Sequence, residues 1–136
     1  MNEYLIEGHP LFLDLDEARI ALRNVEISIG ARKMVIPSVD LDTGFTAGMF
    51  GPQAELDALL GDDWAARTLR TLNGPLLTRA ASATVVLGSG LLTQRIEVLA
   101  APGVDRWLLG LPVIRAFDLL LRGDQPHGHI AVLSPR

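Results

Sequence analysis

Apolar and polar residues alternate along much of the chain, in the pattern of short β-strands. Between residues 19 and 29 the apolar side chains fall mostly at every second position, which is typical of a strand with one buried face. The alternation slips by one position at Arg23 and Asn24, which indicates a β-bulge. A turn follows, and Met34 opens a second strand that runs toward Asp42, so these two segments predict a hairpin.

A short helix is expected after this hairpin. Leu56, Leu59 and Leu60 have the spacing that places them on one helix face. Pro52 suits the first turn of such a helix, because its fixed φ is helical and its missing N–H is not needed there. Gly61 suits the C-terminal cap. These residues predict one helix between two strand-rich parts of the chain.

The second half of the chain reads as further strands separated by turn residues. An Asn-Gly-Pro turn at residues 73–75 precedes two β-rich runs, 78–87 and 91–99, which a Gly-Ser-Gly linker joins into a second hairpin. Final strands are expected over residues 118–121 and 130–133. About six to eight strands with one or two short helices predict a mainly β domain with a closed or sandwiched sheet.

Composition narrows the class of protein. A chain of 136 residues suggests one domain, and 49% hydrophobic against 21% charged residues excludes a disordered chain. The absence of cysteine excludes disulfides, thiolate metal sites and cysteine nucleophiles. A net charge of −4 argues against a nucleic-acid partner. The acidic N-terminus and the short apolar runs predict neither a signal peptide nor a membrane segment, so we expect a cytoplasmic protein.

The strand that begins at Met34 ends in the tripeptide Asp42-Thr43-Gly44, which Phe45 and Thr46 follow. An Asp at a strand end can accept backbone N–H bonds from its own turn, and a Gly lets another chain approach closely. Asp and Gly are common in turns, so the tripeptide alone is a weak signal. A second element strengthens it: Leu108-Leu109-Gly110 precedes a short helix expected over residues 113–117.

This order of elements resembles the retropepsin-like aspartic proteases, particularly the small single-domain members from bacteria and archaea. In that family a strand delivers Asp-Thr/Ser-Gly, a β-hairpin flap follows, and a hydrophobic-hydrophobic-Gly step leads into a helix. The matching residues here are Asp42-Thr43-Gly44, Asn73-Gly74 and Leu108-Leu109-Gly110. The resemblance implies a retropepsin-like closed β-barrel, the acid protease fold, over residues 25–136, with an N-terminal extension over residues 1–24.

The resemblance also implies a reaction and its partners. Such enzymes hydrolyse peptide bonds with two carboxylates and no metal or cofactor. Because this chain offers one Asp-Thr-Gly, the active form would be a homodimer that activates water between the Asp42 side chains of two protomers. Thr43 would bond to the opposite loop, Gly44 would meet the substrate region, Asn73 and Gly74 would lie in the flap, and Leu108, Leu109 and Gly110 would pack behind Asp42 and help form substrate subsites.

The sequence departs from the family pattern at two places, and it also contains two possible metal sites. Pro75 removes a backbone N–H that a flap could donate to substrate, and residues 128–133 are only a weak match to the family's dimer strands. A metal site at His127 and His129 would need a third ligand. Asp40 and Asp42 have a spacing that can hold Mg²⁺, but the chain has no phosphate-binding Gly-Lys loop beside them. The main alternative to a protease is a catalytically silent module of this fold that dimerises or binds peptides.

Overall fold

The computed structural model describes residues 10–15, 20–87, 92–115, 117–121 and 129–135, and side chains for residues 21–87 and 93–115 among them. The strands are β1 (Pro10–Leu15), β2 (Ile20–Ile29), β3 (Arg32–Leu41), β4 (Met49–Pro52), β5 (Ala65–Thr71), β6 (Gly74–Leu87), β7 (Leu92–Ala101), β8 (Leu108–Leu109), β9 (Phe117–Leu121) and β10 (His129–Pro135), and the helices are α1 (Gln53–Leu60) and α2 (Leu111–Ile114). The mainly β class predicted from the residue pattern is therefore confirmed.

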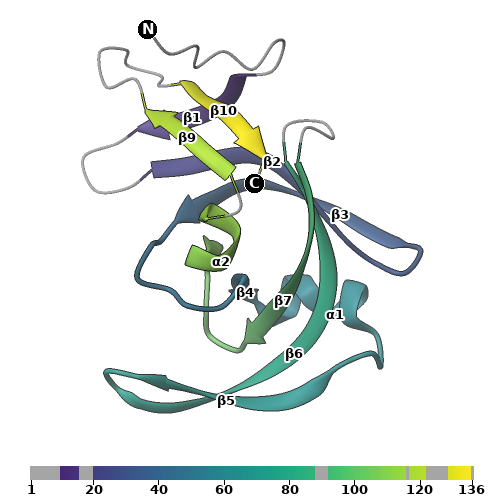
Figure 1. Ribbon diagram of the computed structural model, residues 1–136. Coiled ribbons are helices and arrows are strands. Elements are labelled where there is room, and N and C mark those ends of the chain that lie inside the picture. The colour runs from purple at the N-terminus through teal and green to yellow at the C-terminus, as the bar shows by residue number, and fades with distance from the viewer. Residues whose placement is uncertain (1–9, 16–19, 88–91, 116, 122–128, 136) are drawn as a thin grey trace, which may run out of the picture.

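The strands form one mixed sheet whose middle part closes into a ring. Their order is β5-β6-β7-β4-β8-β3-β2-β1-β10-β9, and β2 pairs a second time, with β6. This extra pairing joins the strands from β6 round to β2 into a ring, with the β5–β6 hairpin extending from one side (Figure 1). Strands β1, β10 and β9 continue the sheet beyond β2 at the other side of the molecule.

The predicted hairpin of β2 and β3 is present, but the predicted bulge is wrong. The register of β2 against β3 is the same on both sides of Asn24, so no residue is inserted there. Asn24 instead has a φ of 55°, a left-handed conformation that Asn tolerates better than most residues. The buried side of β2 changes at this residue, from Leu22 to Val25, and this change produced the slip in the sequence pattern. The partner of β2 changes there too, from β1 to β6.

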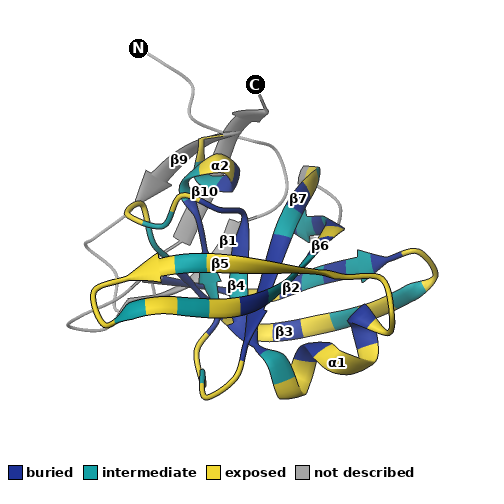
Figure 2. Ribbon diagram, turned by 90° about the horizontal axis from the view of Figure 1, so that it is seen from below, coloured by how far each residue is buried: buried dark blue, intermediate teal, exposed yellow. Residues whose placement is uncertain are grey.

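Helix α1 matches its prediction closely. Leu56, Leu59 and Leu60 are all buried, and they turn one face of the helix toward the core. Pro52 is the N-cap residue, and Gly61 ends the helix with a φ of 52° while its N–H donates to the carbonyl oxygen of Asp57. In Figure 2 the helix lies beside β3, with buried and exposed residues alternating along its length.

The hydrophobic core fills the space that the ring of strands and α1 enclose. Its members are aliphatic except for Trp107, as the scarcity of aromatic residues in the sequence requires. The largest fully buried side chains are Leu22, Ile27, Ile36, Met49, Leu56, Leu60, Leu87, Leu99, Leu109 and Val25. Trp107 lies so close over the backbone of Gly51 that a Cβ atom there would overlap its ring. This close packing fixes β4 against the segment that leads into β8.

The C-terminal part differs from the prediction in its helix. The helix expected over residues 113–117 is α2, which begins earlier and ends at Ile114, while Phe117 already belongs to β9. The helix starts directly after the extended Gly110 because Pro112, in its first turn, has a fixed φ suited to that position. The expected final strands are present as the antiparallel pair β9 and β10.

Four strands were not predicted: β1, β4, β5 and β8. Strand β1 lies inside the segment expected to be an N-terminal extension, and it pairs with β2 and with β10. The Gly-Ser-Gly linker at residues 88–90 and His127 lie outside the described residues, although the two strands that the linker joins, β6 and β7, are antiparallel as expected. No helix among the described residues is long and apolar enough to cross a membrane.

Candidate active site

The tripeptide Asp42-Thr43-Gly44 forms a turn directly after β3, and backbone hydrogen bonds hold it in place. The N–H of Gly44 donates to Oδ1 of Asp42 at 2.9 Å, so the carboxylate is oriented by its own turn. The N–H of Phe45 donates to the carbonyl oxygen of Asp42 at 3.1 Å. The N–H of Asp42 donates to the carbonyl oxygen of Leu109 at 3.0 Å. The turn therefore has a defined shape that presents one carboxylate, and Thr43 is exposed on it.

Strand β8 supports this turn from behind. It lies between β3, to which it is parallel, and β4, to which it is antiparallel. The N–H of Gly110 donates to the carbonyl oxygen of Gly48 at 2.9 Å, and the N–H of Leu111 donates to that of Phe45 at 2.8 Å. A Cβ atom at Gly110 would overlap the carbonyl oxygen of Ala47, so only glycine fits this approach. The predicted Leu108-Leu109-Gly110 element thus does pack against the Asp42 turn.

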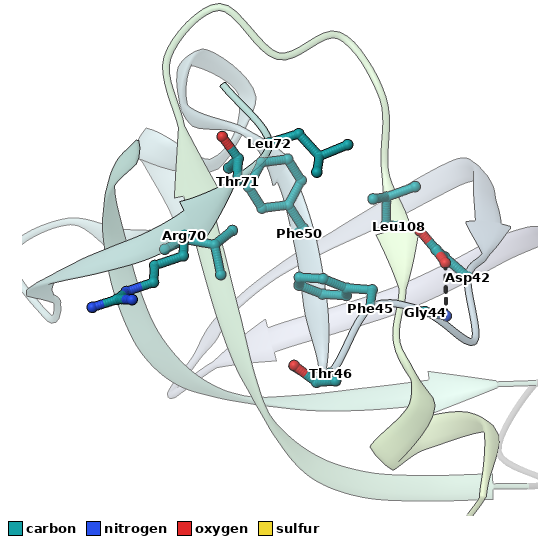
Figure 3. Close-up of a pocket in the computed structure, with 10 residues that line it drawn as sticks. Asp42, Gly44, Phe45, Thr46, Phe50, Arg70, Thr71, Leu72 and Leu108 are labelled. Atoms are coloured by element: carbon teal, nitrogen blue, oxygen red, sulfur yellow. Dashed lines mark hydrogen bonds between the residues drawn. The ribbon is translucent and has the colours of Figure 1, made fainter. Parts of the chain in front are cut away.

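A cavity of about 570 Å³ opens beside the Asp42 carboxylate (Figure 3). It lies between the Asp42 turn and the β5–β6 hairpin, and most of its lining is apolar. Its lining residues are Asp42, Gly44, Phe45, Thr46, Phe50, Leu69, Arg70, Thr71, Leu72 and Leu108. The rings of Phe45 and Phe50 pack edge to face, with centroids 5.8 Å apart. This volume is in the range of cavities that bind small ligands or several side chains of a peptide.

The β5–β6 hairpin turns at Leu72 and Asn73, while Gly74 is already the first residue of β6, and neither Asn73 nor Gly74 lines the cavity. The side chain of Thr71 shapes this turn, because its Oγ1 donates to the carbonyl oxygen of Gly74 at 2.7 Å and accepts from the N–H of Asn73 at 3.2 Å. The neighbouring residue, Leu72, is fully exposed and lines the cavity instead. The sequence pattern placed the turn at residues 73–75, one residue later than it begins in the structure, and the lining residues 69–72 were missed because β5 has no hydrophobic alternation.

The whole chain is similar to a solved structure. The crystal structure of a retropepsin-like aspartic protease from Rickettsia conorii matches it with a TM-score of 0.55, over 96% of both chains and with 16% identical residues. The chain has the retropepsin-like fold. No protein-family model and no curated protein matches its sequence. The fold predicted from two short motifs is therefore confirmed by the structure, although only 16% of the residues are identical to those of the solved structure.

In this retropepsin-like fold, an ion pair lies directly behind the Asp42 turn. The carboxylate of Asp40 is buried, and the guanidinium of Arg106 contacts it with two nitrogens, at 3.1 and 2.5 Å from Oδ2. The next residue, Trp107, donates its indole N–H to Glu55 at 2.9 Å. Arg106 was not identified from the sequence, because nothing local in the chain marks an arginine that pairs with a residue 66 positions away.

The hypothesis of a Mg²⁺ site at Asp40 and Asp42 gains no support from the described part of the retropepsin-like fold, whereas the side chains of His127 and His129 lie outside the described residues. Among the described residues, no three carboxylate or imidazole groups gather in a way that could hold a metal ion. Asp40 contacts Arg106, and the carboxylate of Asp42 accepts the backbone N–H of Gly44, so the two aspartates have separate hydrogen-bond partners. Of the predicted site residues, the cavity brings together Asp42, Gly44 and Leu108.

Proposed function

We propose that this chain is an aspartic peptidase that hydrolyses peptide bonds as a homodimer. One observation carries the proposal: the Asp42 carboxylate, which a backbone N–H orients, lines an apolar cavity within a retropepsin-like fold. An apolar cavity with a single carboxylate suits an extended peptide with hydrophobic side chains. The single Asp-Thr-Gly per chain is the reason to propose a two-fold dimer.

In the proposed dimer the two Asp42 carboxylates share one proton, because two carboxylates about 3 Å apart do not both ionise. The ionised carboxylate accepts a proton from a water molecule while that water oxygen forms a bond to the peptide carbonyl carbon. The protonated carboxylate donates to the carbonyl oxygen as it gains negative charge. The C–N bond then breaks, and the leaving nitrogen takes up a proton from the dyad.

The surrounding residues have supporting roles in this proposal. Gly44 keeps the Asp42 carboxylate in one orientation, and the exposed Thr43 is available to bond the opposite loop across the two-fold axis. Leu108 supplies an apolar wall for substrate side chains, while Leu109 and Gly110 hold the turn from behind. The β5–β6 hairpin, with Asn73 in its turn and Gly74 directly after it, closes over the substrate as a flap and excludes water.

The test is cleavage of a degenerate peptide library, read by mass spectrometry, by the wild-type chain and by Asp42→Asn. We expect cleavage that depends on Asp42, a dimer in solution, and no effect of a chelator. A pepstatin-like transition-state analogue should raise the melting temperature of the wild type but not of the variant. Peptide binding without any cleavage would favour the alternative, a catalytically silent peptide-binding or dimerisation module.

A further inference from the structure

The charge and polarity of the lining differ between the two sides of the cavity beside Asp42. Asp42 is its one acidic lining residue, and Arg70 is its one basic lining residue. In Figure 3 the rings of Phe45 and Phe50 lie between these two charged residues, and the guanidinium of Arg70 points away from Asp42. A ligand that extends from Asp42 across the two rings and past them therefore reaches the guanidinium of Arg70 at its far end.

Arg70 differs from the other arginines of strands β5, β6 and β7. Each of those three has a side-chain partner that the fold supplies. The pairs are Arg67 with Glu97, Arg79 with Asp57, and Arg95 with Ser82. Within the described part of the chain, Arg70 has no ion pair and no side-chain hydrogen bond. Its five N–H donors are thus available to a ligand.

The backbone of Arg70 is fixed even though its side chain is free. Arg70 lies opposite Pro75 in the register of the β5–β6 hairpin, next to the pair of Leu69 and Leu76. The hydrogen bonds of Thr71 close the adjoining turn. The Arg70 side chain therefore extends from a regular strand pair, and the hairpin sets the position of its backbone beside the cavity.

We infer that Arg70 selects peptides that carry an acidic side chain a few residues from the bond held above Asp42. A guanidinium binds a carboxylate with two parallel charge-assisted hydrogen bonds, which an amide of the same shape cannot replace. The apolar lining between the two charged residues accepts the hydrophobic side chains of the intervening residues. This inference rests on the proposed function because it assumes that the ligand is a peptide, but it does not require that the peptide be cleaved.

Binding to the Asp42→Asn variant tests the inference separately from catalysis, since bound peptides then stay intact. A degenerate dodecapeptide library is selected on this variant, and the enriched sequences yield pairs of synthetic peptides that differ only in Glu against Gln. We expect the Glu peptide to bind about threefold to tenfold more tightly, and the difference to shrink as salt is added.

Three further variants assign this preference to one residue. Arg70→Gln should remove the preference for Glu, and Arg70→Glu should reverse it in favour of peptides with Lys. Lys33→Gln is the matched control, because Lys33 is exposed on β3, carries the same charge and does not line the cavity. It should leave the preference unchanged.

The outcomes separate the inference from the proposed function. A preference that reverses with Arg70→Glu supports the inference, even if the wild-type chain cleaves none of the selected peptides and the proposed peptidase activity fails. Cleavage by the wild type with equal binding of Glu and Gln peptides supports the activity and overturns the inference. Absence of peptide binding overturns both. If Lys33→Gln also removes the preference for Glu, the effect is one of net charge, and the inference is overturned.

Discussion

The guanidinium of Arg106 contacts the carboxylate of Asp40, two residues before Asp42 in the chain, with Nη2 at 2.5 Å from Oδ2. The Asp40 side chain is only 7% exposed, whereas that of Arg106 is 58% exposed. The backbone adds a second link, since the N–H of Asp40 donates to the carbonyl oxygen of Trp107 at 2.9 Å. Together these contacts fasten the end of β3 to the segment that leads into β8, directly behind the Asp42 turn.

Arg106→Gln should therefore destabilise the protein, by about 1–3 kcal/mol in the free energy of unfolding. The reason is that the buried carboxylate of Asp40 loses the two hydrogen bonds from this guanidinium, and the value is reduced because Arg106 is partly exposed to solvent. Urea unfolding followed by circular dichroism measures the difference. Arg70→Gln is the control and should leave the midpoint unchanged. The double variant Asp40→Asn/Arg106→Gln should recover part of the loss. Equal midpoints for Arg106→Gln and its control would show that the ion pair contributes nothing.

Asp42→Asn should abolish peptide cleavage and leave the fold intact. The amide keeps the shape of the carboxylate and can still accept the N–H of Gly44, but it cannot take a proton from water. We expect kcat/KM for a fluorogenic peptide to fall by about a thousandfold or more. Asp62→Asn, at an exposed position after α1, is the control and should retain activity. Light scattering should give the same mass for both variants. Full activity of Asp42→Asn would exclude the proposed mechanism.

Leu72→Ala should lower activity without lowering stability. Leu72 is fully exposed in the free chain, so its truncation removes no core contact, yet it lines the cavity where a peptide would cover it. We expect kcat/KM to fall about threefold to tenfold, mainly through KM, and the unfolding free energy to stay within about 0.5 kcal/mol. Leu77→Ala on the same hairpin is the matched control, since Leu77 is exposed but does not line the cavity. Equal losses for the two variants would argue against a substrate contact at Leu72.

Gly110→Ala should destabilise the fold far more than Gly30→Ala. A Cβ atom at Gly110 would overlap the carbonyl oxygen of Ala47, so β8 would have to move away from the Asp42 turn. We expect a loss of about 3 kcal/mol or more. At Gly30 the space is open and only the φ of 60° opposes a side chain, which costs about 1 kcal/mol. Differential scanning calorimetry of the two variants compares these values, and similar melting temperatures would contradict the close packing at Gly110.

The sequence predicted those parts of the fold in which the residue types and their local spacing indicate a single secondary structure. The leucines of α1 and its terminal Gly61 have the period and the cap of a helix, and the structure confirms both. Two short motifs, around Asp42 and Leu108, were enough to indicate the retropepsin-like fold. In each case the signal lies in neighbouring residues and needs no knowledge of the distant chain.

The parts that were missed depend on contacts between distant segments. Strand β4 is only four residues long and contains Gly51 and Pro52, and it is a strand because β7 and β8 lie on its two sides. Strand β5 is exposed along almost its whole length, so hydrophobic alternation could not reveal it. Arg70 reaches the cavity because β5 pairs with β6. The pair of Asp40 and Arg106 likewise follows from the path of β8 and from no pattern in the sequence.

The position of β8 between β3 and β4 has a consequence for how this chain folds. The N–H of Asp42 donates a hydrogen bond to the carbonyl oxygen of Leu109, which the ribosome adds to the chain much later than Asp42. Closing so long a loop carries a large entropic cost, so such contacts form late. The backbone support of the Asp42 turn is therefore completed only after the chain as far as Leu109 has been synthesised.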